Sequence, residues 1–329
     1  MKAAKIIEKG RVDIVDLPKP EPGDGEVLIR VESSGICGTD LHMYHGQSMG
    51  GYPIVPGHEF AGVVEAAGRG TSRFKAGDRV AVEPNLSCGN CPACLENRQH
   101  FCRNWQALGV TLPGGMAEYA VAPENAAFGI GDLDSDSGSF VEPLSCVLHG
   151  LERLGPRIGD RSLLLGTGPI GLLLMRVLKC AGASGIDVIE TDAGRREMAA
   201  KEGMGAAFSS FDGVEKRRYD AVIDATGVLA AERDALDFVR DCGTVLYFGV
   251  PPEGGTFALE PYQLFRRELT LLSTFTSLRN SLQAVRLMRE GAVKVSDLVS
   301  HRLPLEDLEK AFTMLIEKRE PALKVVMKP

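Results

Sequence analysis

Residues 161–182 read RSLLLGTGPIGLLLMRVLKCAG, an apolar run that passes through a cluster of glycines into a second apolar run. A strand, a G-x-G-x-x-G turn and a helix in this order are typical of a dinucleotide-binding unit, because the glycines permit a tight turn and close approach of a pyrophosphate to the helix N-terminus. The turn consists of Gly166, Thr167, Gly168, Pro169, Ile170 and Gly171. The alternative is a glycine-rich turn that binds no ligand.

The residues that follow the turn favour a bound dinucleotide, and NAD over NADP. A second predicted strand, GIDVIETD, ends at Asp192, about twenty residues beyond the turn, where an acidic residue binds the adenosine ribose. A carboxylate in this place repels the additional phosphate of NADP. Arg196 is a further candidate for cofactor binding, and because it and Arg195 lie close to Asp192, NADP stays open as an alternative.

The chain on both sides of this unit predicts an α/β protein with two domains. The N-terminal part contains short β-rich runs such as EVLIRVESSG and FAGVVEAAG, separated by Gly, Pro and Asp, which indicates a mainly β domain. Strands then alternate with helices, which is the pattern of a doubly wound parallel sheet covered on both faces. We place the C-terminal runs SLQAVRLMREG and ALKVVMKP back on the first domain. The expected domains are 1–150 with 276–329, and 151–275.

Four of the eight cysteines stand together in CGNCPACLENRQHFC. Their short spacings let one loop wrap a metal ion, and four thiolates complete the tetrahedral shell of a structural zinc site. Disulfides are the alternative, but two-residue spacers suit chelation better and nothing else indicates an oxidising compartment. The predicted lobe spans 88–102, and we expect its His100 to be exposed. The predicted ligands are Cys88, Cys91, Cys94 and Cys102.

A second set of metal-binding residue types is dispersed along the chain. Cys37 stands in SSGICGTDLH, His58 and Glu59 in VPGHEFAG, and Glu142 in SFVEPLSC. One thiolate, one imidazole and one or two carboxylates leave zinc an open coordination position, as in a catalytic site. Each residue alone has a simpler explanation as a buried thiol, a core histidine or a surface charge. Their occurrence beside a cysteine lobe and a dinucleotide turn favours a catalytic zinc.

Composition and charge exclude other classes of protein. The 329 residues, 44% of them hydrophobic, can form two full cores. The net charge of −7 and the interspersed charges provide no basic stripe for nucleic acid or an anionic membrane. The N-terminus lacks the apolar core of a signal peptide, and the most apolar stretch, 162–175, is too short to span a bilayer. We expect a cytoplasmic protein in which Cys146, Cys180 and Cys242 are small buried hydrophobic residues.

Taken together, these motifs resemble those of the zinc-dependent medium-chain dehydrogenases, most closely the sorbitol, polyol and threonine dehydrogenase branch. The segments GICGTDLH, VPGHEFAG, the cysteine lobe, PGGMAEY, EPLS, GTGPIG and SHRLPLEDLEKAF stand in the family's order over essentially the whole chain. The resemblance implies a GroES-like catalytic domain and a Rossmann domain with the active site between them. It also implies a homo-oligomer, either a dimer or a tetramer, and a small-molecule alcohol as substrate.

The resemblance also assigns individual roles. Cys37, His58 and Glu59 match the catalytic zinc ligands, and Glu142 stands where classical alcohol dehydrogenases have a cysteine, so whether both glutamates bind the ion is open. Thr39 and His42 match the hydroxyl and the imidazole of the proton relay. The four lobe cysteines match the ligands of the structural zinc, which gives two zinc ions per chain. Where sorbitol dehydrogenases tend to have an Arg-Tyr pair, this chain has Thr276 and Ser277, followed by Arg279, which is either a surface residue or a partner for an anionic substrate group.

The expected reaction is hydride transfer from a secondary alcohol of polyol type to NAD, which gives the ketone. L-threonine 3-dehydrogenase and polyol-phosphate dehydrogenase activities are alternatives within the branch. A zinc-free quinone reductase would lack the cysteine lobe and the Cys-His-Glu set. A non-catalytic zinc- and dinucleotide-binding relative would be expected to have lost metal ligands or the glycine turn, and this sequence retains both.

Overall fold

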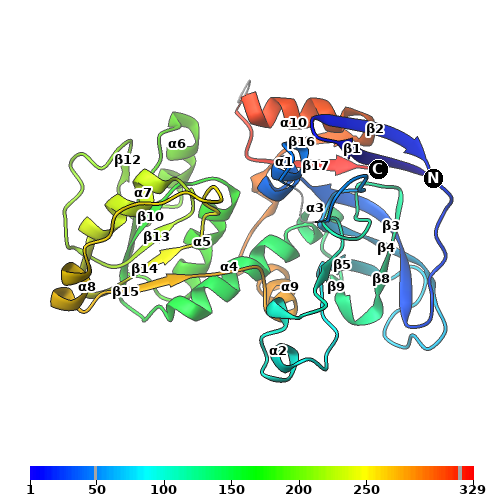
Figure 1. Cartoon of the computed structure of the whole chain (residues 1–329), viewed down its shortest axis with the longest axis horizontal. Coiled ribbons are helices and arrows are strands. Elements are labelled where there is room, and N and C mark those ends of the chain that lie inside the picture. Colours follow the sequence, from blue (N-terminus) through cyan, green and yellow to red (C-terminus); the bar gives the residue numbers. More distant parts are fainter. Residues whose placement is uncertain (48–49, 318–320) are drawn as a thin grey trace. The chain divides into compact units, whose positions relative to one another are not determined.

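The computed structural model describes residues 1–47, 50–317 and 321–329. The chain divides into two compact units, one formed by Met1–Ser145 with Ser277–Pro329 and the other by Cys146–Thr276 (Figure 1). The boundary predicted after residue 150 falls inside helix α4 (Val141–Leu154). In the part of the chain that the structure describes, no helix is both long and apolar enough to cross a membrane.

The first unit is built on a mixed sheet of seven strands within the described residues, with the order β16-β17-β3-β4-β5-β9 and β8 paired to β3. Two further pairs, β1-β2 and β6-β7, lie beside it. The strands are β1 (Lys2–Glu8), β2 (Arg11–Asp16), β3 (Glu26–Gly35), β4 (Glu59–Ala67), β5 (Arg79–Val82), β6 (Asn85–Leu86), β7 (Gln106–Ala107), β8 (Tyr119–Pro123), β9 (Ala127–Gly129), β16 (Val299–Pro304) and β17 (Lys324–Lys328). The helices are α1 (Gly38–Tyr44), α2 (Pro92–Leu95), α3 (Ser135–Gly138), the start of α4, α9 (Ser281–Arg289) and α10 (Leu308–Glu317).

Three strands of this sheet meet at the C-terminal end of β3. Gly35 pairs with Glu59 of β4 on one side and with Val326 of β17 on the other, and both pairings are antiparallel. Because strand register fixes which residues are neighbours, the loop after β3, the start of β4 and the start of β17 come together. These three segments are far apart in the sequence.

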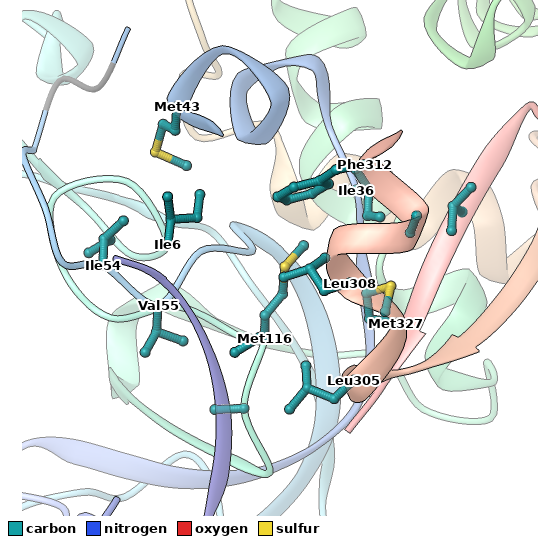
Figure 2. Packing of buried hydrophobic residues seen from close by; sticks show 14 of the residues in the cluster. Ile6, Ile36, Met43, Ile54, Val55, Met116, Leu305, Leu308, Phe312 and Met327 are labelled. Atoms are coloured by element: carbon teal, nitrogen blue, oxygen red, sulfur yellow. The ribbon is translucent and has the colours of Figure 1, made fainter. Parts of the chain in front are cut away.

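An apolar core anchors helix α1, which follows that loop. Figure 2 shows Met43 of α1 above Ile6 of β1, with Leu308 and Phe312 of α10 and Met327 of β17 nearby. Leu308 and Phe312 are four residues apart and therefore share one face of their helix. Each of these side chains is at most 1% exposed, and burial of such a side chain stabilises the fold by about 1.5–3 kcal/mol.

The second unit contains a parallel sheet with the order β12-β11-β10-β13-β14-β15. Numbered along the unit this is 3-2-1-4-5-6, the order of a Rossmann domain. Its strands are β10 (Arg161–Leu165), β11 (Gly185–Ile189), β12 (Ala207–Phe208), β13 (Tyr219–Asp224), β14 (Val239–Tyr247) and β15 (Thr270–Ser273). Its helices are the rest of α4, α5 (Pro169–Cys180), α6 (Ala193–Lys201), α7 (Leu229–Asp234) and α8 (Pro261–Arg267).

Strand β10 shows why a near-continuous apolar run forms a central strand. Successive side chains point to opposite faces of a sheet, and Leu163, Leu164 and Leu165 are all at most 1% exposed. Both faces of the sheet are therefore covered, as the sequence predicts for a doubly wound fold, and the predicted α/β class is confirmed. The expectation of three buried cysteines is wrong: Cys180 and Cys242 are exposed and Cys146 is partly exposed. Cys180 follows the exposed Lys179 at the end of α5, and Cys242 lies in an exposed stretch of β14.

Candidate metal centres and dinucleotide-binding turn

The metal-binding atoms of Cys37, His58 and Glu59 lie within 4.8 Å of one another. The pairing of Gly35 with Glu59 produces this arrangement, since it brings residues 58 and 59 beside the loop that begins after β3. His58 and Glu59 are only 6% and 1% exposed. A partly exposed thiol with a buried imidazole and a buried carboxylate at this separation suits a zinc ion. Glu142, at the start of α4, is also buried but is not part of this three-residue group.

The carboxylate of Asp40 links the segments that carry the metal-binding residues. It is fully buried and accepts hydrogen bonds from the backbone N–H of Cys37 at 2.8 Å and of Gly57 at 3.2 Å. Its Oδ1 lies 3.8 Å from Nδ1 of His58. Asp40 was not among the residues predicted for the site, although an acidic residue at the third position of a helix that begins after Cys37 indicates a reciprocal cap.

The electrostatic environment of His58 favours a cation. Burial alone would lower the pKa of this imidazole, but the Cys37 sulfur and the Asp40 carboxylate raise the pKa well above its usual value. A negative field of this kind also favours a metal ion beside the ring. The donor set and its field therefore fit the catalytic zinc that the sequence implies.

The two residues predicted for the proton relay lie on α1. The Thr39 hydroxyl oxygen is 3.8 Å from the Cys37 sulfur, so Thr39 adjoins the metal-binding group. His42 is exposed, and its Nδ1 lies 2.7 Å from Oε1 of Gln47. Residues three apart lie on the same side of a helix, which places both side chains on one face of α1.

Lys324, the first residue of β17, extends into the metal-binding group. Its side chain is 5% exposed and forms an ion pair with the Oε2 oxygen of Glu59. Its Nζ donates to the backbone carbonyl of Ile36 at 3.0 Å. Burial alone would lower the pKa of Lys324, but the negative charges of Glu59, Cys37 and Glu142 raise it. Lys324 was not among the residues predicted for the site.

The four lobe cysteines form a second group of metal-binding atoms within 4.8 Å. Their sulfur–sulfur distances include 3.5 Å for Cys91–Cys94, 3.9 Å for Cys91–Cys102 and 3.5 Å for Cys88–Cys102. Zinc–sulfur bonds of about 2.3 Å in a tetrahedron separate the sulfurs by about 3.8 Å, whereas disulfide sulfurs are about 2.05 Å apart. The lobe therefore fits a zinc ion and not a disulfide pair.

Backbone N–H groups favour the thiolate form of a lobe cysteine, which is the form that binds a metal ion. Those of Arg103 and Cys94 lower the pKa of Cys91 to about 6, which favours the thiolate that binds zinc. The expectation that His100 is exposed is wrong. It is buried, with its ring centre 4.3 Å from that of Phe101, because the 3-10 turn Gln99–Phe101 directs it inward.

The glycines of the predicted dinucleotide-binding turn have distinct steric roles. Gly166 has a φ of 87°, which favours glycine, and a Cβ there would lie 2.7 Å from Cγ2 of Thr226. A Cβ at Gly171 would collide with the carbonyl oxygen of Gly166, so this glycine allows the helix to pack on the turn. A Cβ at Gly168 would have no atom closer than 3.8 Å. The space at Gly168 suits the approach of a phosphate to the start of α5.

Two acidic residues follow β11. Glu190, which the sequence analysis missed, is buried and accepts hydrogen bonds from the backbone N–H of Thr167 at 2.8 Å and from its hydroxyl at 3.1 Å, so it fixes the turn. Asp192 is exposed and caps α6 by accepting from the backbone N–H of Arg195 at 2.8 Å. Arg196 donates to the carbonyl oxygen of Glu190 at 2.8 Å. Pro169 and Ile170 form the first turn of α5, where backbone N–H groups lack partners within the helix.

Structural contacts occupy the segment where this chain has Thr276 and Ser277 in place of the Arg-Tyr pair of sorbitol dehydrogenases. Ser277 donates to Oε2 of Glu83 at 2.8 Å. Arg279 donates to Oδ1 of Asn97 in the cysteine lobe at 3.4 Å. These contacts favour a structural role for Arg279 over a role in binding an anionic substrate.

Comparison with known proteins agrees with this fold and these sites. Residues 23–132 match the sequence model of the alcohol dehydrogenase GroES-like domain, and residues 169–290 match that of zinc-binding dehydrogenases. The chain is 36% identical over 320 residues to a protein of Agrobacterium fabrum named D-altritol 5-dehydrogenase, with 95% of each chain covered. The chain therefore belongs to the zinc-binding dehydrogenases, oxidoreductases that act on secondary alcohols, as the sequence motifs predict.

Two solved structures show the same architecture with different cofactors. A structure described as a zinc-binding dehydrogenase from Sinorhizobium meliloti 1021, bound to NADP, superposes with a TM-score of 0.93 at 34% identity and covers 100% of this chain and 99% of that one. A structure described as a short chain alcohol dehydrogenase from Escherichia coli CFT073, complexed with NADH, gives a TM-score of 0.92 at 27% identity with the same coverage. The predicted GroES-like and Rossmann domains are thereby confirmed.

Proposed function

We propose that this protein catalyses the NAD-dependent oxidation of a secondary alcohol in a polyol to the corresponding ketone. The observation that carries the proposal is the group formed by Cys37, His58 and Glu59, whose metal-binding atoms lie within 4.8 Å of one another. The Thr39 hydroxyl adjoins this group, 3.8 Å from the Cys37 sulfur. The similarity to a D-altritol dehydrogenase supports a polyol as the substrate class.

Two zinc ions per chain are part of the proposal. Cys37, His58 and Glu59 would hold the catalytic ion, with Glu142 as a further carboxylate nearby, and the lobe cysteines would hold the structural one. A zinc ion with an open position supplies Lewis acidity, which makes an alcohol easier to deprotonate. Asp40 contributes by orienting the loop of Cys37 and the imidazole of His58.

Thr39 is the proposed acceptor of the alcohol proton. A hydroxyl can accept one proton while it donates its own, so Thr39 can pass a proton on without a lasting charge. His42 is the proposed second member of the relay, because it lies on the same face of α1 and is exposed to solvent. Histidine commonly serves as such a shuttle.

The dinucleotide would bind at Gly166, Gly168 and Gly171, with its pyrophosphate at the start of α5. At this turn, NAD would supply the hydride acceptor for oxidation of the alcohol carbon. The exposed carboxylate of Asp192 supports NAD over NADP, because a 2′-phosphate beside it would be repelled. The adjacent Arg196 is the residue that would favour NADP, so the two cofactors have to be compared directly.

We also propose that the protein is a cytoplasmic homo-oligomer, a dimer or a tetramer. Strand β15 lies at one end of the parallel sheet, and an uncovered strand edge offers backbone groups to a partner. Tyr262 and Phe265 of the adjacent α8 are 62% and 78% exposed. The free cysteines support a reducing compartment. Light scattering of the purified protein measures the oligomeric state, and a monomer would contradict this part.

The test of the reaction is cofactor reduction, followed by absorbance, with zinc-loaded protein and a panel of polyols, diols, threonine and polyol phosphates. We expect one polyol class to reduce NAD, chelator to abolish the reaction, and zinc to restore it. If the protein prefers threonine or a polyol phosphate, that compound and not an unphosphorylated polyol is its substrate class. Failure of every alcohol with both cofactors, in protein that holds two zinc ions, would favour a non-catalytic relative.

A further inference from the structure

Lys324 is a buried cation at the metal-binding group. Its side chain is 5% exposed, and its ammonium contacts Oε2 of Glu59 and the carbonyl oxygen of Ile36. Its Nζ also lies 5.9 Å from the centre of the Phe140 ring. The ammonium is therefore enclosed by one carboxylate, one carbonyl and one aromatic ring, with little access to water.

The backbone makes room for this ion pair at Gly35. A Cβ at Gly35 would overlap Oε2 of Glu59 and would lie 2.8 Å from Cε of Lys324. Gly35 is not in the left-handed region of backbone space, so its backbone does not require glycine. The glycine at this position is explained by the space that the carboxylate and the ammonium occupy.

A buried charge is costly unless it is paired. Among the residues that the structure describes, Lys324 and Arg267 are the buried lysine and arginine side chains. Arg267 lies in the other unit and is bound by Asp241 and backbone carbonyls, whereas the carboxylate partner of Lys324 is a predicted metal ligand. The ammonium of Lys324 and a metal ion would thus compete for the carboxylate of Glu59.

A carboxylate has two oxygens that can serve two cations or bind one cation through both. Because Lys324 contacts Oε2, that oxygen is partly neutralised and its share in binding a metal ion is reduced. The ammonium also repels a dication electrostatically, and this repulsion is strong where water is excluded. Both effects would weaken a bond between Glu59 and a metal ion.

We infer that Lys324 is a positioning residue of the catalytic metal centre, which holds Oε2 of Glu59 and so keeps this glutamate a weak, one-oxygen ligand. This inference rests on the proposed function, because it requires zinc at the Cys37 group. Without the ammonium, both carboxylate oxygens of Glu59 would be available to the ion, and the position open to an alcohol would be narrower.

The test uses full-length protein with zinc in the cysteine lobe and Co²⁺ at the Cys37 group, because visible bands of Co²⁺ respond to the number and geometry of its ligands. Lys324→Met removes the charge at similar length. We expect its Co²⁺ spectrum to change, and loss of Co²⁺ to a chelator to slow by on the order of tenfold, the usual scale for neighbours of metal ligands. Lys324→Arg keeps the charge and should resemble the wild type more closely.

The Glu59→Gln background separates positioning from a general effect of charge. If Lys324 acts through Glu59, adding Lys324→Met to Glu59→Gln changes Co²⁺ retention and the spectrum much less than it does in the wild type. Equal effects in both backgrounds would overturn the positioning role. Faster loss of Co²⁺ from Lys324→Met, or an unchanged spectrum, would overturn it as well.

Gly35→Ala provides a second route if Lys324→Met does not fold. The added methyl group should displace the ion pair and change the Co²⁺ spectrum while it leaves the lysine charge in place. An unchanged spectrum in folded Gly35→Ala would contradict the inference. If the wild type itself binds metal only in the cysteine lobe, the proposed function fails. If it binds both ions and the variants match it, only the role of Lys324 fails.

Discussion

The Oδ1 oxygen of Asp40 lies 3.8 Å from Nδ1 of His58, while the other oxygen of the same carboxylate accepts a hydrogen bond from the backbone N–H of Cys37 at 2.8 Å. One fully buried side chain thus joins two predicted ligands of the catalytic ion. Residues that hydrogen-bond to metal ligands orient these ligands and increase their basicity. The affinity of Cys37, His58 and Glu59 for zinc should therefore depend on Asp40, although Asp40 is not a predicted zinc ligand.

Asp40→Asn should weaken binding of the catalytic zinc by about tenfold to a hundredfold, because the amide keeps the size of the side chain but loses its charge. The rate of zinc loss to a chelator measures this effect. Asp24→Asn is the matched control, since Asp24 is exposed and its carboxylate pairs with Arg69 on the surface. Retention of zinc by Asp40→Asn as in the wild type would refute the role of this carboxylate.

Thr39→Ala should reduce turnover by about a hundredfold to ten-thousandfold, the usual contribution of a positioned proton-transfer group. Zinc content should be unchanged, because the hydroxyl is not among the predicted ligands. Thr39→Ser keeps the hydroxyl and should retain most of the turnover. If steady-state kinetics show that Thr39→Ala turns over as fast as the wild type, Thr39 is not part of the relay.

Asp192→Ser should shift the cofactor preference toward NADP. Serine can still cap α6, so the variant removes the charge and keeps the helix start that Asp192 provides. A hydrogen bond to a charged group contributes about 1.5–3 kcal/mol, so the ratio of kcat/KM for NAD to that for NADP should fall by about tenfold or more. An unchanged ratio would remove Asp192 from cofactor selection.

Glu232→Gln should stabilise the protein at neutral pH and above. Glu232, on α7, is buried, and its Oε1 has no hydrogen-bond partner among the described residues. Burial, with a smaller effect of Asp224, raises the pKa of Glu232. The folded state therefore holds this proton more tightly than the unfolded state, and stability is lost as the pH rises through the raised pKa.

The amide introduced by Glu232→Gln would not ionise, so this loss should disappear in the variant. We expect a gain of about 1 kcal/mol at pH 7, the lower end of the cost of an unsatisfied buried group. Chemical denaturation at several pH values measures it, and the two proteins should converge at acidic pH. A variant that is less stable than the wild type at every pH would show that Glu232 makes a stabilising contact.

Features that depend on neighbours in the sequence could be predicted. The cysteine lobe and the glycine turn each occupy one short segment, so the spacing of their residues along the sequence indicates what each binds. The alternation of strands and helices likewise predicted the parallel sheet. Cys37, His58 and Glu59 are brought together by the pairing of β3 with β4, and the sequence pointed to them through motifs that resemble those of a known family.

Features that depend on strand register were missed. Lys324 donates to the carbonyl of Ile36 across 288 residues, and no local pattern marks a lysine in an apolar terminal strand as part of a metal centre. Gly35 follows two serines in a strand and looks like an ordinary strand end, because only the partner strands show what a Cβ would meet. Glu190 was overlooked because the acidic residue expected after the second strand was assigned to Asp192.

The most direct test of the account is the zinc content of the wild type and of Cys37→Ser, measured together with polyol oxidation. We predict two zinc ions per chain in the wild type, and in the variant one ion, held by the cysteine lobe, with a folded structure and no activity. If Cys37→Ser retains both zinc ions and oxidises polyols like the wild type, the group of Cys37, His58 and Glu59 is not the catalytic metal centre.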